Sequence, residues 1–191
     1  KRGNKVFFLN PPLINWSFNI QSTLIIQNLY IIDYGMFLKG LNRLPFSMRS
    51  KVQVVLARWI QDYLKIEFDV VWNFDPYRFQ YMKCFGADLN IYHSVDFYKT
   101  RLEREAAKFA NIVLVTSDKI LENLQNVMTP KFKINHGVAK KFFKESTNLS
   151  NQKVSSKIIE VGYVGNLLYK YLDTSTLKIL IEENKDVQFS F

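Results

Sequence analysis

Apolar and polar positions alternate along the middle of the chain with two different periods. Between residues 50 and 64, SKVQVVLARWIQDYL places its apolar side chains three and four positions apart, which predicts an amphipathic helix with Ser50 as its N-cap. After this segment, short apolar runs separated by more polar stretches predict strands and helices in succession. The predicted strands are 69–74, 88–93, 111–116 and 131–136, and the predicted helices are 77–85, 97–110 and 118–127.

Helix-start signals support this succession. Asp75 and Pro76 form an N-cap and first-turn pair before the helix 77–85, and Ser117 caps the helix 118–127. Strand–helix units that recur every ~20–25 residues favour crossover connections and parallel strands. The predicted fold class is therefore α/β, with a Rossmann-like, mostly parallel sheet.

The first third of the chain is expected to contribute further strands to the same domain. KVFFLN (5–10) is an apolar run stopped by two prolines, and TLIIQNLYIIDYG (23–35) has strand composition with a turn at Gln27–Asn28. The opening KRGN reads as the end of an earlier element, with glycine as a helix C-cap. We therefore expect a segment of the protein to precede Lys1.

The strand–helix pattern stops at the polar stretch ESTNLSNQKVSS (145–156), which predicts a linker. After it, KIIEVGYVG begins a strand, DTSTLKILIEEN (173–184) is a capped helix, and KDVQFSF (185–191) begins another strand. The predicted organisation is a Rossmann-like domain over 1–145, a linker over 146–157, and the opening β-α-β of a second Rossmann-like domain over 158–191.

Composition narrows the class of protein. With 191 residues, 48% of them hydrophobic, the chain can bury a substantial core, yet it has no apolar run of the ~20 residues needed to span a bilayer. A single cysteine, Cys84, excludes an internal disulfide and fits a reducing cytoplasm. With only two histidines besides, no metal site is expected.

The net charge of +9 is unevenly spread along the chain. Residues 1–60 carry eight Lys and Arg against one acid, Asp33. Such a surface suits an anionic partner, either nucleic acid or the head groups of a membrane leaflet, and an ordinary solvated basic face explains it equally well. Because no recognisable nucleic-acid module is present, nucleic acid is not expected as a partner, and peripheral contact with an anionic membrane surface stays open.

Candidate chemistry is expected at the carboxyl ends of the predicted strands, where parallel α/β sheets gather their ligands. His93 and Asp96, in YHSVD, could supply a base or donate to a sugar hydroxyl or a phosphate. Asp75 at another strand end is more simply a helix cap, and His136–Gly137 is more simply a turn. The candidate residues at these strand ends are Asn10, Asp75, His93, Asp96, His136 and Gly137.

A glycine-bearing turn follows the first strand of the predicted second domain. IIEVGYVGNL (158–167) places Gly162 and Gly165 where the backbone can bend tightly and approach a ligand, and Asn166 offers an amide. The pattern matches neither G-x-G-x-x-G nor the P-loop, so an ordinary tight strand–helix turn explains it as well.

The order of these motifs resembles that of bacterial family 4-type glycosyltransferases of GT-B fold. The stretches that carry the resemblance are YHSVD, ANIVLVTSDKILENL, KINHGVAKKFF and VGYVGNLLYKYLD, and the match is densest over 69–175. It implies two Rossmann-like domains that face each other across a cleft. It also implies transfer of a sugar, with retention, from a nucleotide-diphosphate donor to a glycan or lipid-linked acceptor in bacterial surface polysaccharide synthesis. No cofactor and no metal are implied, and the location is cytoplasmic, with possible contact at the inner face of the cell membrane.

The resemblance also implies roles for particular positions. Those for the donor diphosphate are Gly162, Gly165 and Asn166, those for catalysis are His93 and Asp96, and those at the cleft or the inter-domain edge are Asn10, Asp75, His136 and Gly137. The resemblance further implies that the basic, aromatic first third of the chain binds the acceptor.

The chain departs from the family pattern at both ends. It stops before the acidic E-x₇-E-type motif of the second domain could occur, and the first strand with its glycine-rich acceptor loop, expected before Lys1, is missing. Activity is therefore expected of a longer parent rather than of this chain alone. Two alternatives stay open: a non-catalytic α/β module that binds a glycan or an anionic polymer, and a nucleotide-sugar epimerase of GT-B fold.

Overall fold

The structure, a computed structural model, describes residues 3–13, 19–35, 40–137, 140, 159–165 and 172–190. The chain divides into two compact units, 1–136 and 137–191. The first unit contains two sheets and the second contains one. The predicted linker 146–157 lies outside the described residues.

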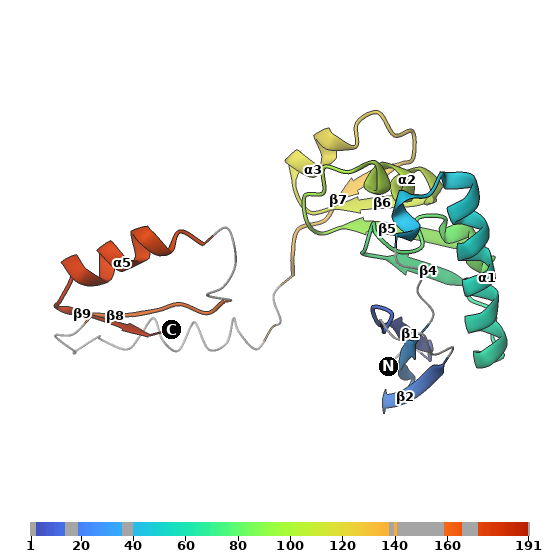
Figure 1. The fold of residues 1–191 in the computed structure, drawn as a ribbon, viewed down its shortest axis with the longest axis horizontal. Coiled ribbons are helices and arrows are strands. Elements are labelled where there is room, and N and C mark those ends of the chain that lie inside the picture. Colours follow the sequence, from blue (N-terminus) through green and yellow to red (C-terminus); the bar gives the residue numbers. More distant parts are fainter. Residues whose placement is uncertain are drawn as a thin grey trace. The chain divides into compact units, whose positions relative to one another are not determined.

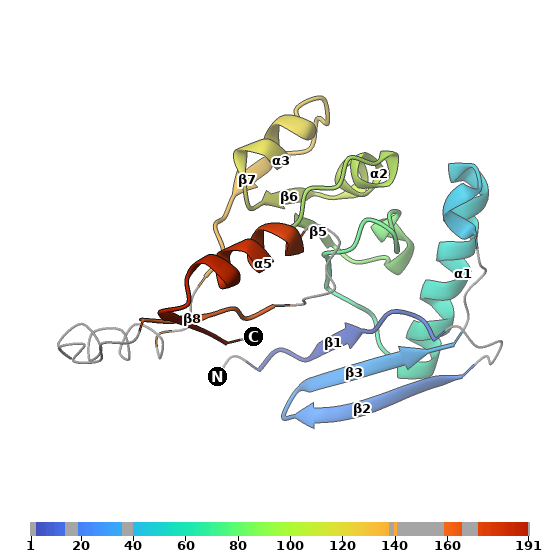
Figure 2. The ribbon, with the colours of Figure 1, turned by 60° about the vertical axis from the view of Figure 1, so that its left-hand side comes forward.

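The first unit begins with a three-stranded mixed sheet of order β1-β3-β2 (Figure 2). β1 (Val6–Leu9) runs parallel to β3 (Leu29–Tyr34), whereas β2 (Ile20–Ile26) runs antiparallel to β3. The predicted turn at Gln27–Asn28 is confirmed, and Asn28 has a φ of 68°, in the left-handed region that asparagine tolerates. This hairpin departs from a mostly parallel sheet, because a two-residue turn joins antiparallel neighbours.

A second sheet of four strands confirms the parallel α/β expectation for the middle of the chain (Figure 1). All three of its strand pairs are parallel, and the strand order follows the sequence. β5 is joined to β6 by α2 (Arg101–Phe109), and β6 to β7 by α3 (Asp118–Asn123). The strands are β4 (Val70–Asn73), β5 (Leu89–Ser94), β6 (Ile112–Val115) and β7 (Lys131–Lys133), the last shorter than predicted.

The predicted N-cap at Ser50 is wrong. Helix α1 spans Phe46–Leu64 and begins four residues earlier, after the short 3₁₀ helix η1 (Leu41–Arg43). Pro45 precedes α1, and its carbonyl oxygen accepts from the backbone N–H of Arg49 at 3.0 Å. Ser50 lies inside the helix, where its hydroxyl donates to the Ser47 carbonyl oxygen at 3.2 Å.

Side-chain caps fix where the helices that follow β5 and β6 begin. The Thr100 hydroxyl accepts from the backbone N–H groups of Leu102 and Glu103, so α2 begins four residues later than predicted. The predicted cap at Ser117 is confirmed, because its hydroxyl accepts from the N–H of Ile120. Helix α3 ends at Asn123, earlier than predicted.

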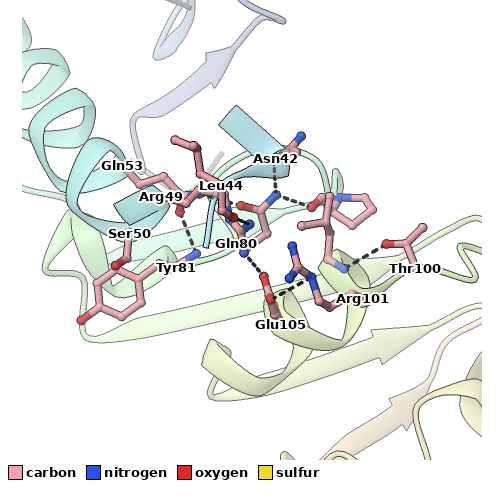
Figure 3. A network of polar contacts seen from close by, with 12 residues as sticks. Asn42, Leu44, Arg49, Ser50, Gln53, Gln80, Tyr81, Thr100, Arg101 and Glu105 are labelled. Atoms are coloured by element: carbon pink, nitrogen blue, oxygen red, sulfur yellow. Dashed lines mark hydrogen bonds and ion pairs between the residues drawn. The ribbon is translucent and has the colours of Figure 1, made fainter. Parts of the chain in front are cut away.

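The predicted helix 77–85 is also wrong. The segment forms turns followed by the short 3₁₀ helix η2 (Met82–Phe85). Some of its backbone groups bond to amide side chains (Figure 3): Gln80 Nε2 donates to the Pro76 carbonyl oxygen at 2.6 Å, and Gln53 Oε1 accepts from the Tyr81 N–H at 2.9 Å. These buried amides make a non-helical backbone stable in this part of the core.

The helices pack on one face of the parallel sheet. On that face the side chains of Tyr92 and Val113 are completely buried against α2, α3 and η2. Alternate residues point to the opposite face, which none of the described helices of the first unit covers, so Trp72 and Phe132 remain 52% and 55% exposed there. His93 alternates with Tyr92 and therefore lies on this open face.

The second unit contains the predicted β-α-β arrangement. β8 (Ile159–Gly162) pairs in parallel with β9 (Val187–Ser190), and α5 (Thr174–Glu183) lies between them in sequence. Asp173 caps α5 by accepting from the N–H of Thr176 at 3.0 Å. None of the helices in the described parts of the chain combines the length and the apolar character that crossing a membrane requires.

Candidate functional site

The carboxyl ends of β1 and β4 meet at Arg78. Its Nε donates to Oδ2 of Asp75 at 2.7 Å, and its Nη1 donates to the carbonyl oxygen of Leu9 at 3.4 Å. Leu9 ends β1, and Asp75 follows β4 by two positions. β1 is an edge strand of the three-stranded sheet, and β4 is an edge strand of the four-stranded sheet. These strand ends therefore lie at the edges of two sheets, and the carboxyl ends of parallel strands are where α/β folds gather ligands.

The predicted site residue Asn10 lies at these strand ends. It follows Leu9 directly, and its Nδ2 donates to Oδ1 of Asp33 at 2.7 Å. Tyr34, at the end of β3, also belongs here: burial raises the pKa of its phenol, and the adjacent Arg78 guanidinium opposes that shift. β3 thus supplies the groups that hold both Asn10 and Arg78 in place.

The loop after β4 is held by its own side chains. Asp75 is not a helix cap as predicted; its Oδ1 accepts from the N–H of Tyr77 at 2.8 Å in a turn. Asn73 Oδ1 accepts from the N–H of Asp75, and Asn73 Nδ2 donates to the carbonyl oxygen of Arg78. Phe79 has a φ of 47°, which is uncommon for a bulky residue and marks backbone strain of the kind that clusters at ligand sites.

A cavity of about 190 Å³ separates β1 from β4. Its walls are mainly aromatic, and the Asp75–Arg78 ion pair is the charged part of its lining. Because these side chains occupy the space between the strands, β1 and β4 form the edges of two sheets rather than neighbours in one. The lining residues are Phe7, Phe8, Leu9, Phe68, Val70, Val71, Trp72, Asn73, Phe74, Asp75, Arg78, Phe79 and Phe85.

His93 lies beside this cavity, at the carboxyl end of β5. Its ring centroid is 5.2 Å from that of Phe74 and 6.0 Å from that of Trp72, and these two rings stack on each other at 5.7 Å. Both nitrogens of His93 are buried, and neither has a hydrogen-bond partner among the residues that the structure describes. Such unsatisfied nitrogens are rare in folded proteins and indicate a place for an incoming polar group.

The electrostatics of His93 keep it neutral at pH 7. Desolvation lowers the pKa of its imidazole, and the nearby His136 lowers it further. A neutral imidazole carries an N–H donor on one ring nitrogen and a lone pair on the other, so it can donate to one polar group and accept from another. The predicted residue His136 is itself exposed but lies close enough to act on the charge of His93.

The structure does not bring His93 and Asp96 together, because neither nitrogen of His93 has a partner. Asp96 is exposed in the loop after β5, where its Oδ2 accepts from the Tyr98 hydroxyl at 3.4 Å. Burial, followed by the charges of Asp96 and Asp75, raises the pKa of Tyr98. Tyr98 therefore lies within reach of the charges of both Asp96 and Asp75, and Asp96 shares no hydrogen bond with His93.

The glycines singled out by the sequence adopt ordinary backbone conformations. Gly137 and Gly162 have no positive φ and have open space where a side chain would be. At Gly165 an added Cβ would lie 2.5 Å from the Tyr163 hydroxyl oxygen, which is the end of a side chain that can move aside. Asn166 lies outside the described residues.

Sequence reasoning missed several members of the site. Arg78 carried a usable signal, since it lies three positions after Asp75 and opposite charges at that spacing often pair. Trp72 and Phe74 appeared as ordinary apolar residues of a buried strand, because their exposure depends on which sheet face the helices leave open. Among the described residues, no group of three or more His, Cys, Asp and Glu side chains could hold a metal ion.

Comparison with models of known protein families, with curated proteins and with solved structures gives no match. The function of the site therefore rests on its own geometry and chemistry. What that geometry supplies is a neutral histidine, an exposed aromatic pair and a charged pair around a small cavity at the carboxyl ends of β1, β4 and β5.

Proposed function

We propose that this chain is part of a glycosyltransferase that moves a sugar from a nucleotide-diphosphate donor to a glycan or lipid-linked acceptor. The observation that carries the proposal is His93, with two buried and unpartnered ring nitrogens beside the exposed Trp72–Phe74 pair. The position of His93 at the carboxyl end of a parallel strand supports a role in the reaction. The order of motifs along the sequence supports the GT-B class.

In this reaction the acceptor hydroxyl oxygen bonds to the anomeric carbon of the donor sugar while the bond from that carbon to the diphosphate oxygen breaks. The acceptor hydroxyl loses its proton. Because His93 is neutral at pH 7, it can accept a hydrogen bond from that hydroxyl or take its proton. Asp96 stands apart from His93 and is assigned to a different hydroxyl of the bound sugars.

The donor is assigned to the second unit, at the turn after β8. The support here is the motif GYVGN together with the open space around Gly162, which leaves the backbone accessible to a diphosphate. The first unit, whose residues 1–60 carry most of the excess positive charge, is assigned to the acceptor.

The test is made on the longer parent protein that contains this chain, of which turnover is expected, and it combines donor binding with turnover. Saturation-transfer NMR with UDP-, GDP- and ADP-linked hexoses is expected to detect binding of at least one donor, and addition of a glycan acceptor to release the nucleoside diphosphate. His93→Phe keeps a ring against Phe74 and Trp72 but removes both nitrogens, so it is expected to slow release by about a hundredfold or more. The control Lys51→Ala, on the exposed side of α1, leaves the rate unchanged.

Two results contradict the proposal: no nucleotide sugar binds, or His93→Phe turns over as fast as the unaltered chain. The first would favour a non-catalytic glycan-binding module, for which the exposed and stacked Trp72–Phe74 pair is the specific observation. Conversion of a free nucleotide sugar without an acceptor would instead favour an epimerase.

A further inference from the structure

We propose that the cavity between β1 and β4 is a subsite for one neutral sugar ring, held by Asp75 and Arg78. This inference deepens the proposed function, on which it rests for the identity of the ring as part of the acceptor. The sugar-binding property itself concerns the first unit alone and can be tested without a nucleotide.

The size of the cavity favours a single ring. At about 190 Å³ it is smaller than the roughly 300–1,000 Å³ of sites for drug-sized ligands. Its floor is formed by partly buried side chains that face the core, including Phe7, Leu9 and Phe79. Its mouth is formed by the exposed side chains of Phe8 and Trp72, which leave a way in from solvent.

The chemistry of the lining favours a neutral, hydroxylated ligand. The aromatic walls accept the C–H faces of a ring, and the amide of Asn73 is already bonded to the loop backbone, so charged recognition falls to Asp75 and Arg78. These two side chains already neutralise each other at 2.7 Å. Arg78 would repel a cationic ligand, and Asp75 would repel an anionic one. A hydroxyl group can instead donate to the carboxylate and accept from the guanidinium.

The loop that carries the ion pair is built as a fixed support. Asn73 and Asp75 bond to the loop backbone, and Phe79 is held with a positive φ against Phe85 and Tyr34. Strain of this kind persists only when the surroundings determine the conformation. The ion pair is therefore preorganised before the ligand arrives, which reduces the entropic cost of binding.

The experiment measures binding of free sugars to the 191-residue chain by saturation-transfer NMR. The probes are glucose, galactose, mannose and N-acetylglucosamine, with choline and benzoate as charged probes. At least one neutral sugar is expected to bind more tightly than either charged probe. Val70→Phe places a larger ring in the lining from an exposed position, so it should weaken that binding by about tenfold or more. The matched control Val55→Phe, exposed on α1 outside the cavity, should leave it unchanged.

A second variant tests the ion pair without filling the cavity. Asp75→Asn keeps an oxygen that can accept from the Tyr77 N–H but removes the charge, and it should weaken sugar binding by about tenfold. The inference is overturned if choline or benzoate binds best, if no neutral sugar binds, or if Val70→Phe binds as tightly as the unaltered chain. Loss of sugar binding with intact nucleotide-sugar turnover would refute this subsite alone. Sugar binding without any nucleotide-sugar binding would refute the transferase instead.

Discussion

Glu103 is a completely buried carboxyl group on the helix-covered side of the parallel sheet. Its Oε1 accepts from the Ser94 hydroxyl at 2.6 Å and its Oε2 accepts from Asn123 Nδ2 at 2.8 Å. Burial nevertheless dominates and raises the pKa of Glu103 from 4.5 to about 6. Because Glu103 bonds to Ser94, the residue that follows His93 in β5, its protonation affects the stability of the fold next to the site.

The sign of this effect on stability follows from the raised pKa. The folded state binds the proton of Glu103 more tightly than the unfolded state does. The stability that Glu103 contributes to folding is therefore fully present below pH 4.5 and is lost as the pH rises through about 6. Glu103→Gln cannot ionise and should escape this loss. The free energy of unfolding of Glu103→Gln relative to the unaltered chain should therefore rise by at most about 2 kcal/mol between pH 4 and pH 7.5.

Urea unfolding at a series of pH values measures this difference. Ser94→Ala removes a donor that stabilises the ionised carboxylate, so it should make the loss with rising pH larger. Parallel pH profiles for Glu103→Gln and the unaltered chain would contradict the prediction.

At the scale of elements, α1 is joined to α2 by a buried ion pair. Arg49 is fully buried; it donates to Glu105 and, through Nη1, to the carbonyl oxygen of Leu44 at 3.0 Å (Figure 3). Glu105 is 17% exposed and also lies 3.5 Å from the exposed Arg101. The two partners thus differ in their access to water. Only Arg49 has none, so protein groups alone stabilise its charge.

Removing the two partners should therefore have unequal costs. Glu105→Ala leaves a buried guanidinium without its carboxylate and should lower the free energy of unfolding by about 3–5 kcal/mol. Arg49→Met should cost less, because Glu105 keeps some solvent and Arg101. Arg101→Ala, the control, should change stability by about 1 kcal/mol or less. Denaturant unfolding at neutral pH compares the three, and a larger loss for Arg49→Met than for Glu105→Ala would contradict the argument.

The wrongly predicted helix 77–85 shows how contacts from distant residues override a local signal. Asp75 and Pro76 carry a helix-start signal, but the following backbone is bonded by Gln53, Gln80 and Asn42 side chains. Gln53 and Asn42 lie more than twenty residues away, so no local pattern reveals them. The succession of parallel strands and the caps at Ser117 and Asp173 depend on neighbours in sequence, and those predictions are confirmed.

At the scale of the whole molecule, the two units differ in how much they bury. The first unit holds two clusters of buried side chains, whereas every described residue of 159–165 and 172–190 is exposed or only partly buried. The part of the second unit that the structure describes, a two-stranded sheet with one helix and no buried residue, is expected to be marginal in water. Backbone amides in β8 and β9 should therefore open far more readily than those in β5 and β6.

Hydrogen exchange of the 191-residue chain measures this contrast. Amides of β5 and β6 should show protection close to the global free energy of unfolding, and those of β8 and β9 protection near zero. Equal protection in the two sheets would contradict the prediction. It would also mean that contacts beyond those within the second unit stabilise β8 and β9.

The sequence by itself determined the α/β class, the parallel order of β4 to β7, and the strand ends at which polar residues collect, because periodicity and capping are local properties. Only the tertiary structure decided which of those residues meet. It placed Arg78 between Asp75 and Leu9, left His93 unpartnered beside Trp72 and Phe74, and separated it from Asp96. Which side chains come into contact depends on how the sheets pack and on which sheet face the helices leave open. These contacts join residues that are far apart in the chain.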